Sequence, residues 1–277
     1  MRILAVDVGG SGAKHAWVEA DRDGVRLVSP VVSLERPEWG RFEPWLASRI
    51  RERPDCLAVS CMGLVDPDSG VNRVASVAGW RNRPLRANLE AAFAPARVVV
   101  LNDVEAHLFA HLGDHPTPLL AMAMGTSVGL AVADESRRVV RTRGGMPLEF
   151  GALRLDTSAT CKELWSALGS IGLEELQRKL GPHEGTVRFG HRAGALLAQY
   201  AGLFSVRTVV LSGGIVESTW RTMGPAVAAE FSRGLPHWLT ESPPRLLASP
   251  HGRAAALVGV AAHARQVMRG GSPAPGR

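Results

Sequence analysis

A glycine-rich turn that carries a hydroxyl group follows the first apolar stretch of the chain. Residues 4–8 are typical of a buried strand that contains one acid, Asp7, and the turn that follows is Gly9-Gly10-Ser11-Gly12. Glycine-rich phosphate loops usually open a helix, but residues 15–20 alternate as in a half-buried strand. The turn is therefore predicted to close a β-hairpin, which excludes a Walker A loop and a Rossmann loop.

The second half of the chain repeats this arrangement. Residues 120–135, LAMAMGTSVGLAVADE, have the same order of strand, small-residue turn and strand as residues 4–20. Two such turns can direct backbone N–H groups and hydroxyls at one polyphosphate. A further pair, Gly213-Gly214, ends a predicted strand and opens a predicted helix, where the backbone can approach a flat ligand closely.

The composition is that of a globular protein with an excess of arginine. The 277 residues are 45% hydrophobic and 21% charged, which predicts two medium-sized domains with cores of their own. The net charge of +6 is spread along the chain with no basic cluster among aromatic residues, so we expect no nucleic-acid partner, whereas small anionic substrates fit this charge.

The cysteines and the apolar runs indicate the expected cellular location of the protein. Cys56, Cys61 and Cys161 form no CxxC pair, which is typical of reduced thiols in a cytosolic protein. No segment resembles a signal peptide, and no apolar run approaches the roughly 18 residues that span a bilayer. We therefore expect a cytoplasmic protein with no membrane partner.

Strand-like and helix-like stretches are mixed along the chain, which predicts an α/β fold. The expected strands cover residues 1–8, 15–20, 25–32, 56–62, 97–101, 118–124, 128–133, 138–142 and 207–212. The expected helices cover residues 44–52, 85–93, 104–112, 160–168, 173–180, 191–204, 217–233 and 253–268.

Five short motifs, in this order along nearly the whole chain, resemble those of sugar kinases of the ROK (repressor, open reading frame, kinase) family. They are a first phosphate loop at Asp7–Gly12, a turn before the hexose site at Cys61–Gly70, a sugar and base motif at Leu101–Asp103, a second phosphate loop at Met124–Gly129 and an adenosine motif at Ser212–Gly214. The compact length is most similar to that of the short bacterial glucokinases that use ATP or polyphosphate.

The resemblance implies a two-lobed actin-like (ribonuclease H-like) ATPase fold, from the actin, hexokinase and Hsp70 superfamily, with an interlobe cleft. We expect an N-terminal lobe over residues 1–113 and a C-terminal lobe over 114–268, whose last helix can return to the first lobe. Residues 269–277 form a tail rich in Gly and Pro that we expect to be disordered.

The resemblance also implies an activity, an ATP-dependent phosphotransfer to a hexose-like acceptor in carbohydrate metabolism, by a homodimer. Asp103 would be the general base that accepts the proton of the attacking hydroxyl, and Asp7 would lie near Mg²⁺. The implied acceptor-binding residues are Ser76, Asn102, Asp103, Glu149 and Glu163. The implied nucleotide-binding residues are Gly9, Gly10, Ser11, Gly12, Lys14, Gly125, Thr126, Ser127, Gly213 and Gly214.

Each of these residues also has an ordinary structural interpretation. Asp103 can be a helix N-cap and Asp7 a turn former. Asn102 can be a turn asparagine, and Lys14 a solvated strand lysine. The glycines can serve only the hairpins, and Glu149 and Glu163 can be exposed surface acids.

The expected acceptor pocket departs from the family pattern. Typical members carry Glu-x-Gly-His, where this chain has Glu149-Phe150-Gly151-Ala152, and Ser76 stands where an asparagine is typical. The usual zinc motif is reduced to Cys161, so we expect no structural zinc, which needs about four ligands. Because a site that pairs a substrate hydroxyl rejects analogues without it by about 10⁴-fold or more, these losses predict a changed acceptor, such as an amino sugar or a carbocyclic sugar analogue.

Four alternatives stay open. The chain can be a sugar-binding pseudokinase, a transcriptional regulator without catalysis, a polyphosphate-dependent glucokinase, or a transferase with a non-sugar acceptor. ROK regulators carry a winged-helix domain before the first strand, whereas Met1 lies at that strand here. The presence of Asp7, Asp103, Gly125 and Thr126 favours catalysis.

Overall fold

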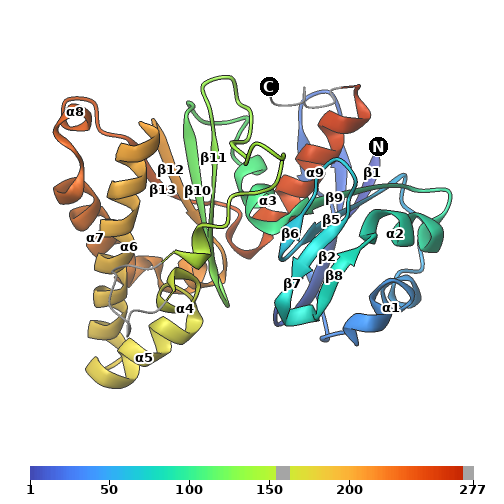
Figure 1. Cartoon of the computed structure of the whole chain (residues 1–277), viewed down its shortest axis with the longest axis horizontal. Coiled ribbons are helices and arrows are strands. Elements are labelled where there is room, and N and C mark those ends of the chain that lie inside the picture. The colour runs from blue at the N-terminus through green and yellow to red at the C-terminus, as the bar shows by residue number, and fades with distance from the viewer. Residues whose placement is uncertain (154–162, 271–277) are drawn as a thin grey trace. The chain divides into compact units, whose positions relative to one another are not determined.

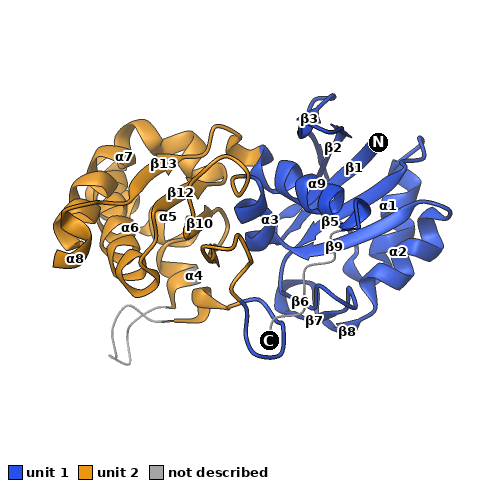
Figure 2. Ribbon diagram, turned by 90° about the horizontal axis from the view of Figure 1, so that it is seen from above, with its two compact units in different colours: residues 1–110, 141–147, 254–277 blue, residues 111–140, 148–253 orange. Residues whose placement is uncertain are grey.

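The computed structural model describes residues 1–153 and 163–270. The chain divides into two compact units (Figures 1 and 2). Unit 1 comprises residues 1–110 and 141–147 together with the described residues from 254 on, and unit 2 comprises residues 111–140 and the described part of 148–253. Cys161, the basis of the zinc expectation, and the tail from residue 271 lie outside the described residues.

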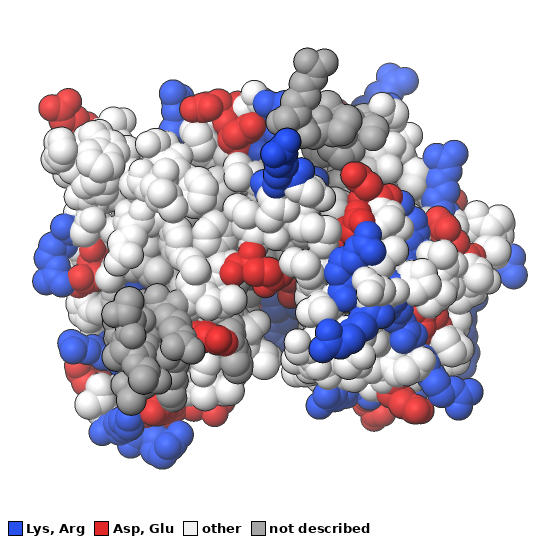
Figure 3. Space-filling view, viewed as in Figure 1, with Lys and Arg blue, Asp and Glu red and all other residues white. Residues whose placement is uncertain are grey.

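Charged side chains are dispersed over the surface that Figure 3 shows. On this face the Lys and Arg side chains form several separate groups, with Asp and Glu side chains between them. A continuous basic track of the kind that follows a nucleic-acid backbone is therefore not visible among the described residues on this face. None of the helices in the described part of the chain has the length and apolar character required to cross a bilayer.

Unit 1 is built on a sheet with the strand order β3-β2-β1-β5-β9, in which β4 also pairs with β2. Strands β1 and β2 form the predicted antiparallel hairpin, whereas β1, β5 and β9 run parallel. The strands of this sheet are β1 (Arg2–Gly9), β2 (Gly12–Ala20), β3 (Val25–Leu27), β4 (Val32–Leu34), β5 (Cys56–Cys61) and β9 (Arg97–Asn102).

Helices cover both faces of this sheet. One face packs against α1 (Phe42–Arg49) and α2 (Leu85–Phe93), with η1 (Trp39–Arg41) beside them. The other face packs against α9 (Ala255–Met268), which lies beside α3 (Asp103–Phe109) in Figure 1. A Cβ on Gly259 would overlap the carbonyl oxygen of Ala106, so the absent side chain lets α3 and α9 approach closely.

A small antiparallel sheet projects from unit 1 between β5 and α2. Its strands are β6 (Leu64–Val65), β7 (Asn72–Ala75) and β8 (Trp80–Arg83), and η2 (Ser76–Ala78) connects the last two. The buried Trp80 anchors this sheet because its indole N–H donates to the Trp39 carbonyl at 3.0 Å and its ring packs on that of Phe42. None of these short strands was predicted, because β6 has only two residues and burial along β7 and β8 does not alternate with a two-residue period.

Unit 2 is built on a sheet with the strand order β11-β10-β12-β13. Strands β10 and β11 form the second predicted hairpin, and β10, β12 and β13 run parallel. The strands are β10 (Leu119–Met124), β11 (Val128–Ala133), β12 (Thr208–Ser212) and β13 (Arg245–Ala248). The short, half-exposed β13 was not predicted.

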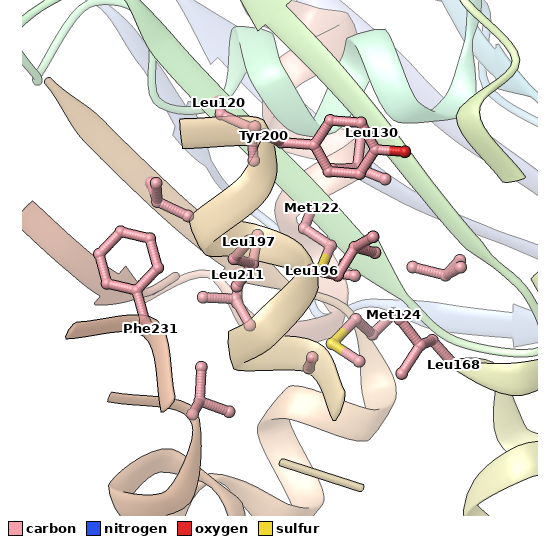
Figure 4. Packing of buried hydrophobic residues seen from close by; sticks show 14 of the residues in the cluster. Leu120, Met122, Met124, Leu130, Leu168, Leu196, Leu197, Tyr200, Leu211 and Phe231 are labelled. Atoms are coloured by element: carbon pink, nitrogen blue, oxygen red, sulfur yellow. The ribbon is translucent and has the colours of Figure 1, made fainter. Parts of the chain in front are cut away.

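Helices pack against one face of this second sheet (Figure 4). The core combines strand residues such as Met122 and Leu211 with helix residues such as Leu197 and Phe231. The helical elements are η3 (Phe150–Ala152), α4 (Leu164–Ala167), α5 (Ser170–Leu180), α6 (Pro182–Phe204), α7 (Gly214–Gly234) and α8 (His237–Thr240), and η4 (Gly252–Ala254) leads into α9.

The strand predicted over residues 138–142 is wrong. Only an isolated bridge between Ala133 and Val139 forms there. The chain then leaves the sheet, and the Arg141 guanidinium makes a bidentate ion pair with the buried Glu105 on α3, with both N···O distances at 2.8 Å. This pair holds residues 141–147 in unit 1.

Candidate active site

Acidic residues lie at the carboxyl edge of the parallel strands in unit 1. Asp7 on β1 faces Ser60 on β5, and Cys61 on β5 faces Asn102 on β9. Because neighbouring strands are about 4.8 Å apart, the ends of β1 and β9 are separated by roughly 10 Å. Asp103 follows β9 directly, so Asp7 and Asp103 belong to one edge of the sheet, the edge at which open α/β sheets bind ligands.

Asp7 is held by two neighbours. The Ser60 hydroxyl donates to Asp7 Oδ1 at 2.8 Å, and Lys14 Nζ lies 2.9 Å from Asp7 Oδ2. The Asp7 side chain is 12% exposed and that of Lys14 24%, so Lys14 is not a solvated strand lysine. The two residues face each other across the β1/β2 hairpin.

Asn102 caps α3 with its side chain. Its Oδ1 accepts the backbone N–H groups of Val104 at 3.0 Å and Glu105 at 3.2 Å, and its Nδ2 donates to the Gly63 carbonyl at 2.8 Å. These bonds use the amide oxygen for the cap and leave the second Nδ2 hydrogen for another partner. The N-cap role considered for Asp103 therefore belongs to Asn102, and Asp103 is the first residue of α3.

The charges of these acids shift the pKa values of two buried groups, Cys61 by both acids and His107 by Asp7 alone. Burial raises the pKa of the Cys61 thiol, and the negative charges of Asp103 and Asp7 raise it further. Burial also lowers the pKa of His107 to about 4, with Asp7 acting in the opposite direction and Lys14 in the same one. Asp7, Lys14 and His107 therefore share one environment beneath the edge.

Sequence reasoning did not select Ser60 or His107. Ser60 is a polar break in the apolar run CLAVSC, and His107 lies one helical turn after Asp103. Both signals become informative only when the register of β1 and β5 and the position of α3 are known.

Ser76 lies at the same edge, on η2. Gly63, which follows β5 and accepts the hydrogen bond of Asn102, packs so closely on β7 that an added Cβ would lie 2.8 Å from the Cβ of Ala75. The exposed Ser76 follows Ala75 directly, and the next residue, Val77, packs against Gly10. The structure thus places Val77, the neighbour of Ser76, against the Gly9–Gly12 turn.

The predicted nucleotide-binding residues of unit 2 also lie together. The turn Gly125-Thr126-Ser127 closes the β10/β11 hairpin, and the Gly125 N–H donates to the Ser127 carbonyl at 2.9 Å. Gly213 has a φ of +101°, and a Cβ there would lie 3.0 Å from the carbonyl carbon of Met124 and overlap its oxygen. Glycine is therefore required where β12 meets α7, and Gly214, with open space around its Cβ position, begins that helix.

Glu149 and Glu163 lie on two elements of unit 2 that contact each other. Glu149 precedes η3, Glu163 precedes α4, and the Leu164 N–H donates to the Leu153 carbonyl at 2.7 Å. Glu149 is exposed by accessible area, although desolvation by nearby protein atoms raises its pKa. Ala152 on η3 presents no polar side chain beside it.

The described residues contain no preformed metal cage. No group of three or more His, Cys, Asp or Glu side chains within residues 1–153 and 163–270 could hold a metal ion. A metal at the edge would therefore need ligands from a bound substrate in addition to Asp7.

Comparisons with solved structures identify the fold. A ROK family glucokinase from Streptomyces griseus, solved with glucose and AMPPNP, matches with a TM-score of 0.79 and 20% identity over 96% of this chain and 100% of that chain. An inorganic polyphosphate/ATP-glucomannokinase from Arthrobacter sp. strain KM matches with a TM-score of 0.69 and 18% identity over 96% of this chain and 99% of that chain.

A ROK family transcriptional regulator, described as a homologue of an Escherichia coli protein, matches with a TM-score of 0.72 and 14% identity over 95% of this chain and 78% of that chain. No protein-family model matches the sequence, and no curated protein does. The predicted fold class is confirmed: the chain has the actin-like α/β fold of these solved ROK proteins.

Proposed function

We propose that this chain is a ROK-type sugar kinase that transfers the γ-phosphate of ATP to a hydroxyl of a hexose-like acceptor. The observation that carries this proposal is the pair of carboxylates, Asp7 and Asp103, at the carboxyl edge of the parallel strands in unit 1. The fold match to a glucokinase solved with glucose and AMPPNP supports it.

Asp103 is the proposed general base. It would accept the proton of the acceptor hydroxyl while that oxygen attacks the γ-phosphorus and ADP leaves. The cap made by Asn102 sets the start of α3 and with it the backbone of Asp103. The remaining Nδ2 hydrogen of Asn102 is available to a sugar oxygen.

Asp7 fits a magnesium site of the kind that nucleotide kinases use. Mg²⁺ is commonly held by one or two carboxylates together with phosphate oxygens and waters, and Asp7 supplies one carboxylate where the described residues form no larger cage. The bound ion would neutralise the charge of the phosphates during transfer. Lys14, whose Nζ neutralises Asp7 before the ion binds, would then be available to a phosphate oxygen.

The donor is proposed to be ATP. The residues proposed to bind it are, in unit 2, those of the β10/β11 turn and of the α7 start and, in unit 1, those of the Gly9–Gly12 turn. Backbone N–H groups of such turns suit phosphate oxygens, and the open space beside Gly125 and Gly214 admits a ligand close to the backbone. The match to a polyphosphate/ATP-dependent enzyme makes polyphosphate the second candidate donor. Turnover with ATP and with polyphosphate, measured on the same acceptor, separates the two.

The acceptor is proposed to differ from glucose, because Ala152 and Ser76 stand where the family has larger polar side chains. The test is a panel of hexoses, amino sugars and cyclitols with ATP and Mg²⁺ and coupled detection of ADP. We expect one class to exceed glucose clearly in kcat/KM. Glucose turned over within the usual range of about 10⁴ to 10⁸ M⁻¹s⁻¹, with no better acceptor, would identify a simple glucokinase.

A non-catalytic sugar-binding protein is the second candidate function, since a transcriptional regulator shares the fold. The same panel, monitored by calorimetric binding, discriminates between the two. Binding of an acceptor without ADP release under any condition would favour the non-catalytic function over the kinase.

A further inference from the structure

An exposed apolar side chain lies at the tip of the η2 turn. Val77 is 55% exposed, although valine is among the residues most often buried in folded proteins. The turn that carries it is fixed on both sides, because Ala75 before it and Trp80 after it are buried. The exposure of Val77 is therefore a property of an ordered turn.

Val77 faces the first glycine turn. Its two γ-carbons lie 3.5 and 3.8 Å from the position that a Cβ on Gly10 would occupy. Its neighbour Ser76 is not among the atoms within 4 Å of that position. Of the two exposed residues at the tip of η2, it is Val77 whose side chain reaches the turn that follows Asp7.

A continuous set of contacts in unit 1 runs from Val77 back to the proposed base. Ala75, two residues before Val77, packs against Gly63, and the Gly63 carbonyl accepts a hydrogen bond from Asn102, which precedes Asp103. In the other direction Val77 contacts Gly10, three residues after Asp7. Val77 is thus connected, through residues of unit 1, to the ends of both strands that carry the carboxylates.

We propose that Val77 determines acceptor specificity, by requiring an apolar group rather than a hydroxyl on the part of the acceptor that meets the tip of η2. This inference rests on the proposed kinase function and adds to it a specific residue and a class of acceptor. Isopropyl carbons neither donate nor accept hydrogen bonds, so a hydroxyl buried against them loses its water without a replacement. A deoxy carbon or a methyl group loses no hydrogen bond when it is buried against Val77.

The test compares a set of hexoses with their single-position deoxy derivatives on the full chain. Both kcat/KM with ATP and Mg²⁺ and calorimetric affinity are measured for the natural protein, for Val77→Thr, which keeps the shape and adds a hydroxyl, and for Val77→Asn. Val74→Thr is the matched control, because Val74 is an exposed valine on β7 that is not in contact with Gly10. Since both valines are exposed, thermal unfolding should change little.

We expect one deoxy derivative to exceed its parent hexose in the natural protein, and Val77→Thr or Val77→Asn to shift that ratio toward the parent by about tenfold. Val74→Thr should leave the ratio unchanged. Unchanged ratios in both Val77 variants would overturn the inference while the kinase stands. Acceptor binding without phosphorylation would instead overturn the kinase, and the calorimetric ratios would still decide the role of Val77.

Discussion

The sheets of the two units have the same strand order, but their hairpins carry different side chains. In unit 1 the antiparallel pair β2-β1 is followed by the parallel strands β5 and β9, and in unit 2 the pair β11-β10 is followed by β12 and β13. The sequence echo aligns Asp7 with Ala123. Asp7 faces Lys14 and Ser60, and Ala123 faces Gly129 and Ser212.

The comparison of the two hairpins separates the residues that the hairpin fold requires from residues that it does not require. Both units have a serine on the neighbouring parallel strand and a glycine in the turn, and both form an antiparallel hairpin, with a two-residue turn in unit 1 and a three-residue turn in unit 2. The ion pair of unit 1 is replaced in unit 2 by two of the smallest residues, so the hairpin does not require it. The proposed function assigns Asp7 and Lys14 to a bound ligand instead.

The exits from the second parallel strand show the same constraint with different outcomes. Gly63 after β5 and Gly213 after β12 have φ angles of +86° and +101°, and at both positions a Cβ would overlap a backbone carbonyl oxygen. Unit 1 continues from this glycine into the β6–β8 sheet with Val77, whereas unit 2 continues into α7. The same strand order therefore leads into a small sheet that carries Val77 in unit 1 and into the start of helix α7 in unit 2.

The largest expected effect comes from the acid after β9. We predict that Asp103→Asn lowers kcat by about 10³-fold, within the range for loss of a general base, and leaves acceptor affinity nearly unchanged. Steady-state kinetics and calorimetry measure the two quantities. Asp23→Asn, in an exposed loop of unit 1, is the control and should leave kcat unchanged. If Asp103→Asn keeps more than about a tenth of the natural kcat, Asp103 is not the general base.

The comparison of the hairpins predicts a second effect. Asp7→Ala makes the first hairpin resemble the second at the aligned position, and we expect kcat/KM for ATP with Mg²⁺ to fall by about 10²-fold because the carboxylate proposed to hold Mg²⁺ is lost. Ser60→Ala, which removes only the hydroxyl that contacts Asp7, should lose less. Equal and small losses in both variants would mean that Asp7 serves only the fold.

The strand-exit glycines predict matched losses of stability. Gly213→Ala and Gly63→Ala should each lower the free energy of unfolding by about 2–3 kcal/mol, because each places a Cβ at positive φ against backbone. Gly214→Ala should change it by less than about 0.5 kcal/mol, because its Cβ position is open. Urea unfolding measures all three; a large loss at Gly214 would contradict the difference between these positions.

The smallest expected effect is the pH dependence of stability that His263 contributes in unit 1. Burial, with smaller contributions from Arg141 and Arg86, lowers the pKa of His263 on α9 to about 4 from an ordinary value of 6.5. Between these two pH values the unfolded chain binds the proton and the folded chain does not. The free energy of unfolding is therefore highest above pH 6.5 and falls as the pH decreases. At pH 5 the loss is about 2 kcal/mol for this one group.

His263→Leu should remove that part of the pH slope. The buried Nδ1 of His263 has no hydrogen-bond partner among the described residues, so leucine removes a polar atom without breaking a bond. Unfolding curves at pH 5 and pH 7.5 for both proteins give the difference. An identical slope in the variant would show that His263 does not titrate in this range.

Several elements could be predicted from sequence because their signals are local. The hairpin residues alternate around glycine turns, and α2 was predicted with the bounds that the structure shows, Leu85–Phe93. The strand predicted over residues 25–32 is instead two short strands, β3 and β4, which are separated by residues 28–31, with Pro30 among them. Residues 138–142 have a β-like pattern but form no strand, and Arg141 is instead paired with the distant Glu105.

Local sequence was sufficient for the two strand-turn-strand repeats and for the acids at the strand ends, because periodicity and glycine placement act over neighbouring residues. The pairing of Asp7 with Ser60 and Lys14, the use of Asn102 as a cap bound to Gly63, and the position of Val77 against Gly10 depend on sheet register and on packing between residues far apart in the chain. Such contacts form only when the strands align and the helices cover them, so no pattern along the chain encodes them one residue at a time.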